Sequence, residues 1–108
     1  MVRLVTLLAR TPRHSEATLE GLFRAEVRRS GGMAIKLAPM EAGIPDRLVI
    51  SPDGTMYLVE LKTETGRLRP IQKVVHDRLT KMGVPVVVLA GRDAIVAWIA
   101  DHIPSRSR

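Results

Sequence analysis

Two apolar runs joined by a Pro-Asp-Gly turn constrain the fold of this chain more than any other feature of its sequence. The runs cover residues 44–50 and 56–62, and the turn residues lie between them at 51–55. A turn signal between two short apolar runs predicts a β-hairpin. Because a hairpin brings the start of its first strand opposite the end of its second, we expect residues at those two ends to converge.

Charged side chains stand at these converging ends. Asp46 opens the first strand, and Glu60 and Lys62 close the second. Side chains two apart in a strand share a face, so Glu60 and Lys62 point the same way. Carboxylate oxygens suit Mg²⁺ or Mn²⁺, and such a site can activate water against a phosphodiester, with the lysine orienting that water or neutralising charge. On these residues alone, a solvated charge pair that blocks aggregation is the alternative.

The composition narrows the class of protein. The chain has 108 residues, enough for one domain with a single core. Its 17 Lys and Arg against 11 Asp and Glu give a net charge of +6. This balance favours a polyanionic partner such as DNA, and a basic soluble surface without such a role is the alternative. The absence of cysteine excludes disulfides, thiolate zinc sites and cysteine nucleophiles.

No segment has the features of a membrane span or an export signal. No run approaches the roughly 20 apolar residues that cross a bilayer. The apolar run at residues 2–9 is short and is followed by basic residues without a small-residue cleavage site. We therefore expect a soluble, intracellular protein without a membrane partner, cytoplasmic if the source is prokaryotic.

Periodicity and turn residues predict the element order α-β-β-β-α-β-α. Ser15 suits the N-cap of the first helix, and Pro70 suits the first turn of the second. The predicted helices and strands cover residues 16–29, 33–38, 46–50, 56–62, 70–82, 84–90 and 91–102. A helix between the third and fourth strands allows a parallel right-handed crossover, so we expect an α/β domain with a mixed four-stranded sheet flanked by helices.

Helical spacing also predicts which faces are buried. In the first helix the apolar stripe is expected at Leu19, Leu22, Phe23 and Val27. In the second helix it is expected at Ile71, Val74, Val75, Leu79 and Met82. The continuous apolar strand at 84–90 is typical of a strand covered on both faces. We divide the chain into an apolar arm at 1–14 that packs on its own core or on a second subunit, a domain at 15–103 and a basic tail at 104–108.

The combination of motifs resembles the signature of the VRR-NUC family, a branch of the PD-(D/E)XK nuclease superfamily. The matching residues are Gly43-Ile44-Pro45-Asp46-Arg47, Glu60-Leu61-Lys62, Gly66 and Gln72, preceded by Gly31-Gly32 and Lys36. The resemblance covers about residues 15–90 and implies a restriction-endonuclease-like α-β-β-β-α-β core. It also implies metal-dependent hydrolysis of DNA phosphodiester bonds.

The resemblance assigns roles to individual residues. For Mg²⁺ or Mn²⁺ it implies Asp46, Glu60, the Leu61 carbonyl and a glutamate of the first helix. Helical geometry leaves Glu16, Glu20 and Glu26 open as that acid, or as solvated charges, whereas the family pattern selects Glu20 with Glu16 as second choice. Lys62 would be the catalytic lysine, and Gln72 would lie near the metal.

The remaining predictions concern DNA. Phosphate contacts are expected from Lys36, Arg47, Arg67, Arg69, Lys73 and His76. Solvated charges are the alternative for the basic residues, and a packing role is the alternative for His76. Stand-alone members of the family resemble dimeric resolvases, so we expect a homodimer that cuts Holliday junctions or other branched DNA. A nuclease of flaps, ends or unstructured DNA, and a DNA-binding protein without catalysis, are the alternatives.

Overall fold

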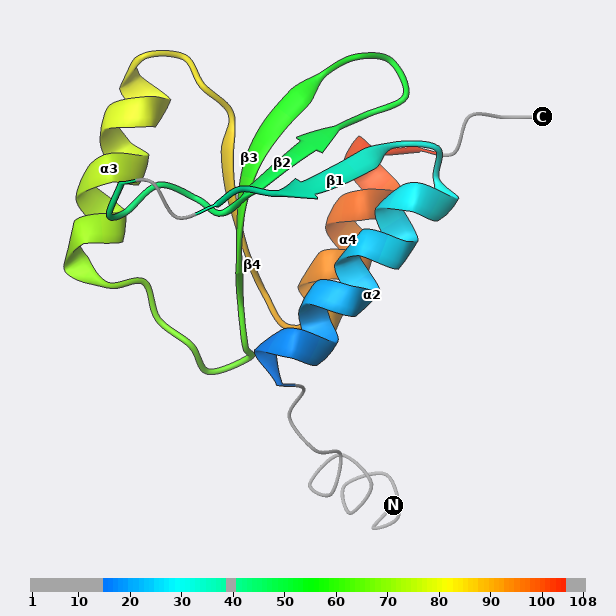
Figure 1. Cartoon of the computed structure of the whole chain (residues 1–108), viewed down its shortest axis with the longest axis horizontal. Helices are drawn as coiled ribbons and strands as arrows, with labels where there is room; N and C mark the ends of the chain where they lie inside the picture. The colour runs from blue at the N-terminus through cyan, green and yellow to red at the C-terminus, as the bar shows by residue number, and fades with distance from the viewer. Residues whose placement is uncertain (1–14, 39–40, 105–108) are drawn as a thin grey trace, which may run out of the picture.

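A computed structural model of the chain describes residues 15–38 and 41–104 (Figure 1). The predicted N-terminal arm and residues 105–108 of the predicted tail lie outside the described residues. The elements, in chain order, are α2 (Glu16–Arg29), β1 (Met33–Lys36), β2 (Arg47–Ile50), β3 (Met56–Lys62), α3 (Pro70–Lys81), β4 (Val86–Ala90) and α4 (Arg92–His102). The predicted order of helices and strands and the α/β fold class are confirmed.

The strands form a mixed sheet in which spatial order follows chain order. Within the described residues the sheet has four strands in the order β1-β2-β3-β4. The pairs β1–β2 and β2–β3 are antiparallel, whereas β3 and β4 are parallel and joined through α3. Arg47 pairs with Val59 across the hairpin. Continuing this register by one position places Asp46 opposite Glu60, as the hairpin predicts.

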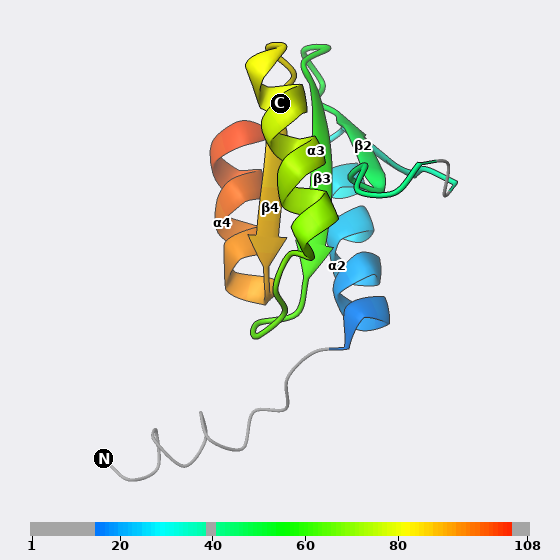
Figure 2. The same cartoon turned by 90° about the vertical axis from the view of Figure 1, so that its left-hand side faces the viewer.

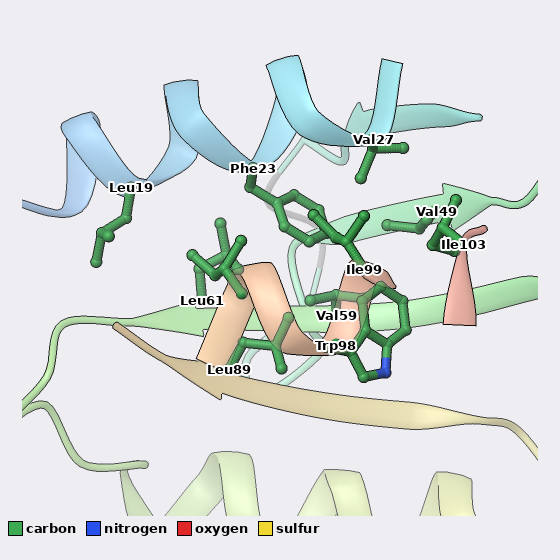
Figure 3. Packing of buried hydrophobic residues seen from close by; sticks show 11 residues of the cluster. Leu19, Phe23, Val27, Val49, Val59, Leu61, Leu89, Trp98, Ile99 and Ile103 are labelled. Carbon is green, nitrogen blue, oxygen red and sulfur yellow. The ribbon is translucent and has the colours of Figure 1, made fainter. Parts of the chain in front are cut away.

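Helices cover the two faces of the sheet unequally. Helices α2 and α4 lie side by side on one face, and α3 lies on the opposite face near β3 and β4 (Figures 1 and 2). The hydrophobic core fills the space between the sheet and the α2–α4 pair (Figure 3). It consists of Leu19, Phe23, Val27, Val49, Val59, Leu61, Leu89, Ile95, Trp98, Ile99 and Ile103.

Local signals at α2 act as predicted. The Ser15 side chain accepts a hydrogen bond of 3.1 Å from the backbone N–H of Thr18, which satisfies one free donor of the first turn. Leu19, Phe23 and Val27 are buried against the sheet. After the helix, a Cβ at Gly32 would lie 2.6 Å from the Ile50 carbonyl oxygen, so only glycine allows this close approach of the chain to β2.

Helix α3 departs from the predicted burial pattern. Ile71, Val74 and Met82 are 43%, 55% and 69% exposed, whereas the polar residues Gln72 and His76 are buried. The helix is rotated about its axis relative to the predicted orientation, because its inner side faces the Glu60 carboxylate, which requires polar partners. The predicted apolar face of this helix is therefore wrong at three of its five positions.

The fourth strand also differs from its prediction. Val88 is 40% exposed on the α3 side of β4, so the expectation that both faces of this strand are covered is wrong. The strand begins at Val86, because Pro85 has no N–H and contributes only its carbonyl, which accepts from Leu58 at 2.9 Å. No helix in the described ranges has the length and apolar character needed to cross a membrane.

Candidate active site

A cleft of about 360 Å³ opens between the loop that precedes β2, strand β3 and the N-terminal turn of α3. Its polar lining comes from Lys36, Glu41, Asp46, Glu60, Arg69 and Gln72. These residues are far apart in the sequence. The antiparallel hairpin contributes the two facing carboxylates, and the crossover helix contributes the amide.

Glu60 is the most enclosed carboxylate of the cleft, with 5% of the residue exposed. Its Oε2 accepts a hydrogen bond of 3.1 Å from Gln72 Nε2 and lies 3.7 Å from Lys62 Nζ. Burial raises the pKa of Glu60, and the negative charge of Asp46 raises it further, while Lys62 and the Gln72 hydrogen bond act in the opposite direction. Lys62 and Gln72 therefore do not fully offset the cost of burying the ionised Glu60 carboxylate beside Asp46.

Gln72 fixes the orientation of its own amide. Its Oε1 accepts a hydrogen bond of 2.8 Å from the backbone N–H of Arg69, at the start of α3. Since the oxygen is occupied in this way, the Nε2 group donates toward Glu60. Pro70 follows Arg69 in the first turn, where its missing N–H costs nothing. The start of α3 therefore holds Glu60 in place.

Arg47 lies inside the protein and not at the surface, where a DNA contact would be expected. The side chain is 3% exposed on the face of β2 that also carries Val49. Its Nη2 lies 3.0 Å from Glu20 Oε1, and its Nη1 lies 3.7 Å from Asp46 Oδ2. The alternation of faces along β2 was the signal for this burial, because it places residues 47 and 49 on the same side.

The three candidate glutamates of α2 have different surroundings. Glu16 is exposed, and Glu26 forms a surface ion pair with Arg29 on the same helix. Glu20 faces the sheet, where Arg47 and Lys36 approach it at 3.0 Å and 3.4 Å. Among these three acids, Glu20 is the one that the fold connects to Asp46, and the connection runs through Arg47.

His76 is also enclosed and does not lie at the surface, where a phosphate contact would be expected. The residue is 7% exposed, and neither ring nitrogen has a hydrogen-bond partner among the described residues. Burial lowers the pKa of His76, the positive charge of Lys62 lowers it further, and the Gly43 backbone acts in the opposite direction. Burial and the Lys62 charge thus both favour the neutral imidazole of His76, which lies one helical turn after Gln72.

The remaining predicted cations lie at the surface of the protein, and two of them line the cleft. Arg67, Arg69 and Lys73 are exposed, and Arg69 also lines the cleft. The Lys36 side chain is 61% exposed and lines the cleft from β1. These positions are open to a polyanion.

Two carboxylates of the cleft fit a hard divalent cation. Mg²⁺ commonly binds one or two carboxylates, waters and substrate phosphate, and Asp46 and Glu60 supply two carboxylates on facing strand ends. A cation would relieve the repulsion that raises the Glu60 pKa. A larger cage is absent from the described ranges, where no group of three or more His, Cys, Asp or Glu side chains is placed to hold a metal.

Comparison with known proteins gives three concordant similarities. The profile of the VRR-NUC domain matches residues 10–93. A protein of Acyrthosiphon pisum secondary endosymbiont phage 1, named "Putative nuclease p44", is 39% identical over 79 residues, which is 72% of this chain and 85% of the phage protein. A solved structure described as a VRR_NUC domain aligns with a TM-score of 0.70 and 31% identity, covering 81% of this chain and 95% of that structure.

Proposed function

Because this chain belongs to the VRR-NUC family, we propose that it is a Mg²⁺- or Mn²⁺-dependent endonuclease that hydrolyses DNA phosphodiester bonds in the cleft. The observation that carries the proposal is the buried Glu60 carboxylate. It faces Asp46, accepts from Gln72 and lies 3.7 Å from Lys62 Nζ. Such an arrangement is costly for folding and useful for holding a cation next to a lysine.

Asp46 and Glu60 would hold the cation, with the Leu61 carbonyl as a further oxygen ligand. When bound, the cation activates water and stabilises negative charge on the scissile phosphate. Glu20 would support the site from behind, because Arg47 connects it to Asp46. Gln72 keeps the Glu60 carboxylate oriented through its hydrogen bond.

Lys62 would act on the phosphate and the attacking water. Its side chain is 17% exposed and shares a strand face with Glu60, so its ammonium group lies beside the Glu60 carboxylate. From this position it can donate a hydrogen bond to a phosphate oxygen or orient the water. Lys36 and Arg69 would bind neighbouring phosphates because they line the cleft. Arg67 lies two residues before Arg69 and Lys73 four residues after it, and both would bind phosphate from exposed positions.

We further propose that the protein acts as a homodimer on branched DNA, in particular on four-way junctions. The proposal is supported by the size of the domain, because one small domain with one cleft does not cut two strands symmetrically, whereas two copies related by a twofold axis present two clefts. Sedimentation of the protein with and without a junction tests the dimer.

A cleavage assay on a four-way junction, with flap and linear DNA of the same sequence, tests the activity. We expect Mg²⁺- or Mn²⁺-dependent cutting that EDTA stops. Asp46→Asn and Lys62→Ala should abolish cutting while leaving DNA binding intact. The exposed-pair variant Arg29→Met, on the outer side of α2, serves as the control and should cut normally. Undiminished cutting by both site variants would refute the mechanism, and equal cutting of all substrates would refute junction selectivity.

A further inference from the structure

Arg47 is a buried cation whose place in the fold is not explained by packing. It enters the core-facing side of β2 at 3% exposure, two residues before the buried Val49. A guanidinium in such a place must be compensated by charge and hydrogen bonds, and an apolar residue of similar volume is often no less stabilising. The buried charge of Arg47 therefore indicates a role other than packing.

The guanidinium is shared between two carboxylates from different elements. Nη2 approaches Glu20 Oε1 of α2 at 3.0 Å, and Nη1 approaches Asp46 Oδ2 at 3.7 Å and the Asp46 carbonyl oxygen at 3.4 Å. Asp46 points toward the cleft, whereas Glu20 belongs to the helix on the other face of the sheet. One planar group with several fixed donors thus spans the end of β2.

We propose that Arg47 is a positioning residue that holds Glu20 and Asp46 together as one unit of the cation site. This inference rests on the proposed function, in which Asp46 holds the cation and Glu20 supports it through Arg47. Outer partners of carboxylate ligands fix their orientation, and their loss commonly weakens metal binding. Lys36 also contacts Glu20, but its side chain is 61% exposed and, among the described residues, forms an ion pair with no second acid, so it does not replace the bridge.

The chemistry of arginine distinguishes bridging from simple neutralisation. A lysine at position 47 keeps the charge but presents a single ammonium group, which cannot span two carboxylates in the same way. If Arg47 acts by bridging, Arg47→Lys loses cation binding nearly as fully as the uncharged Arg47→Met. If it acts only through charge, Arg47→Lys restores the site.

Calorimetric titration of the full chain with Mn²⁺, without DNA, tests this inference. We expect Arg47→Met to raise the Mn²⁺ dissociation constant by about 10–100-fold and Arg47→Lys to raise it by at least about tenfold. Arg29→Met removes another arginine–glutamate pair of α2 at the surface and should leave the constant within about twofold. Binding by Arg47→Lys within about threefold of the wild-type protein would overturn the inference.

A double-mutant cycle with Glu20→Gln examines the shared unit. If Glu20 acts through the bridge, the double variant Glu20→Gln with Arg47→Lys binds Mn²⁺ about as weakly as the weaker single variant, whereas multiplied losses overturn the inference. Circular dichroism checks the fold, and Arg47→Lys carries the conclusion if Arg47→Met does not fold. Absence of Mn²⁺ binding by the wild-type protein would instead refute the proposed function.

Discussion

Replacing Glu60 by Gln removes one negative charge from the cleft while keeping the size of the side chain. In the wild-type protein, burial and the nearby Asp46 carboxylate raise the pKa of Glu60. Ionised Glu60 therefore lowers the stability of the metal-free protein at neutral pH. The amide oxygen introduced by Glu60→Gln can still accept from Gln72, so a hydrogen bond worth about 1 kcal/mol is kept.

Glu60→Gln is expected to be more stable than the wild-type protein without metal and less stable than it when the cation is bound. Without metal, Glu60→Gln should be more stable by about 0.5–2 kcal/mol, the usual gain when a residue retained for function is replaced. A change of 1 kcal/mol shifts the melting temperature of a domain of this size by roughly 4–8 °C. With Mn²⁺ at about one hundred times its dissociation constant, the wild-type protein gains about 2.7 kcal/mol and becomes the more stable of the two.

The pH dependence separates this explanation from a packing effect. The folded-state pKa of Glu60 lies above its ordinary value of 4.5, so the wild-type protein loses stability as the pH rises from about 4.5 through the raised pKa. Below this pH window, the free energies of unfolding of the wild-type protein and of Glu60→Gln should become similar. Denaturant unfolding in EDTA and in Mn²⁺, from pH 4 to 8, measures both effects, with the exposed Glu16→Gln as control. A less stable Glu60→Gln in EDTA at pH 7, or equal stabilisation of both by Mn²⁺, would refute the reasoning.

Three further substitutions probe the supporting residues. Gln72→Ala removes the donor that orients Glu60, and we expect cleavage to fall about 10–100-fold in a steady-state assay, whereas an unchanged rate would exclude an orienting role. His76→Leu removes two unpartnered buried nitrogens and should raise the denaturation midpoint by the equivalent of about 1–2 kcal/mol. Because the His76 pKa is lowered, the wild-type protein should lose stability as the pH falls below 6.5 through that pKa, and the variant should lose less. Gly32→Ala places a Cβ 2.6 Å from the Ile50 carbonyl oxygen and should cost about 1–3 kcal/mol, measurable by urea unfolding, unless β2 can move away.

Much of the fold is encoded in local signals. The Ser15 cap, the turn that joins β2 to β3 and Pro70 at the start of α3 each act over a few residues, so their positions follow directly from the sequence. The hairpin also brings Asp46 opposite Glu60, because strand alternation and register depend on the turn between them. The strand ends are less well predicted, since they depend on which neighbours complete the hydrogen bonds.

The surroundings of the charged residues depend on contacts between distant elements. Apolar spacing on α3 predicts that Ile71 and Val74 face inward, but the structure turns Gln72 and His76 toward β3. Helical periodicity shows which residues share a face, and it cannot show that the facing strand carries a buried carboxylate. The polar partner required by Glu60 outweighs the burial of two aliphatic side chains, which remain at the surface.

By itself, then, the sequence determined the order of the elements, the convergence of Asp46 with Glu60 and Lys62, and the family resemblance that the comparisons confirmed. The tertiary structure decided which glutamate of α2 pairs with Arg47, that Arg47 joins Glu20 to Asp46 inside the protein, and that α3 turns Gln72 toward Glu60. The physical reason is one of range. Turns, caps and strand alternation act between neighbours in the chain, whereas the partner of a buried charge is chosen by the packing of elements that the chain brings together only when it folds.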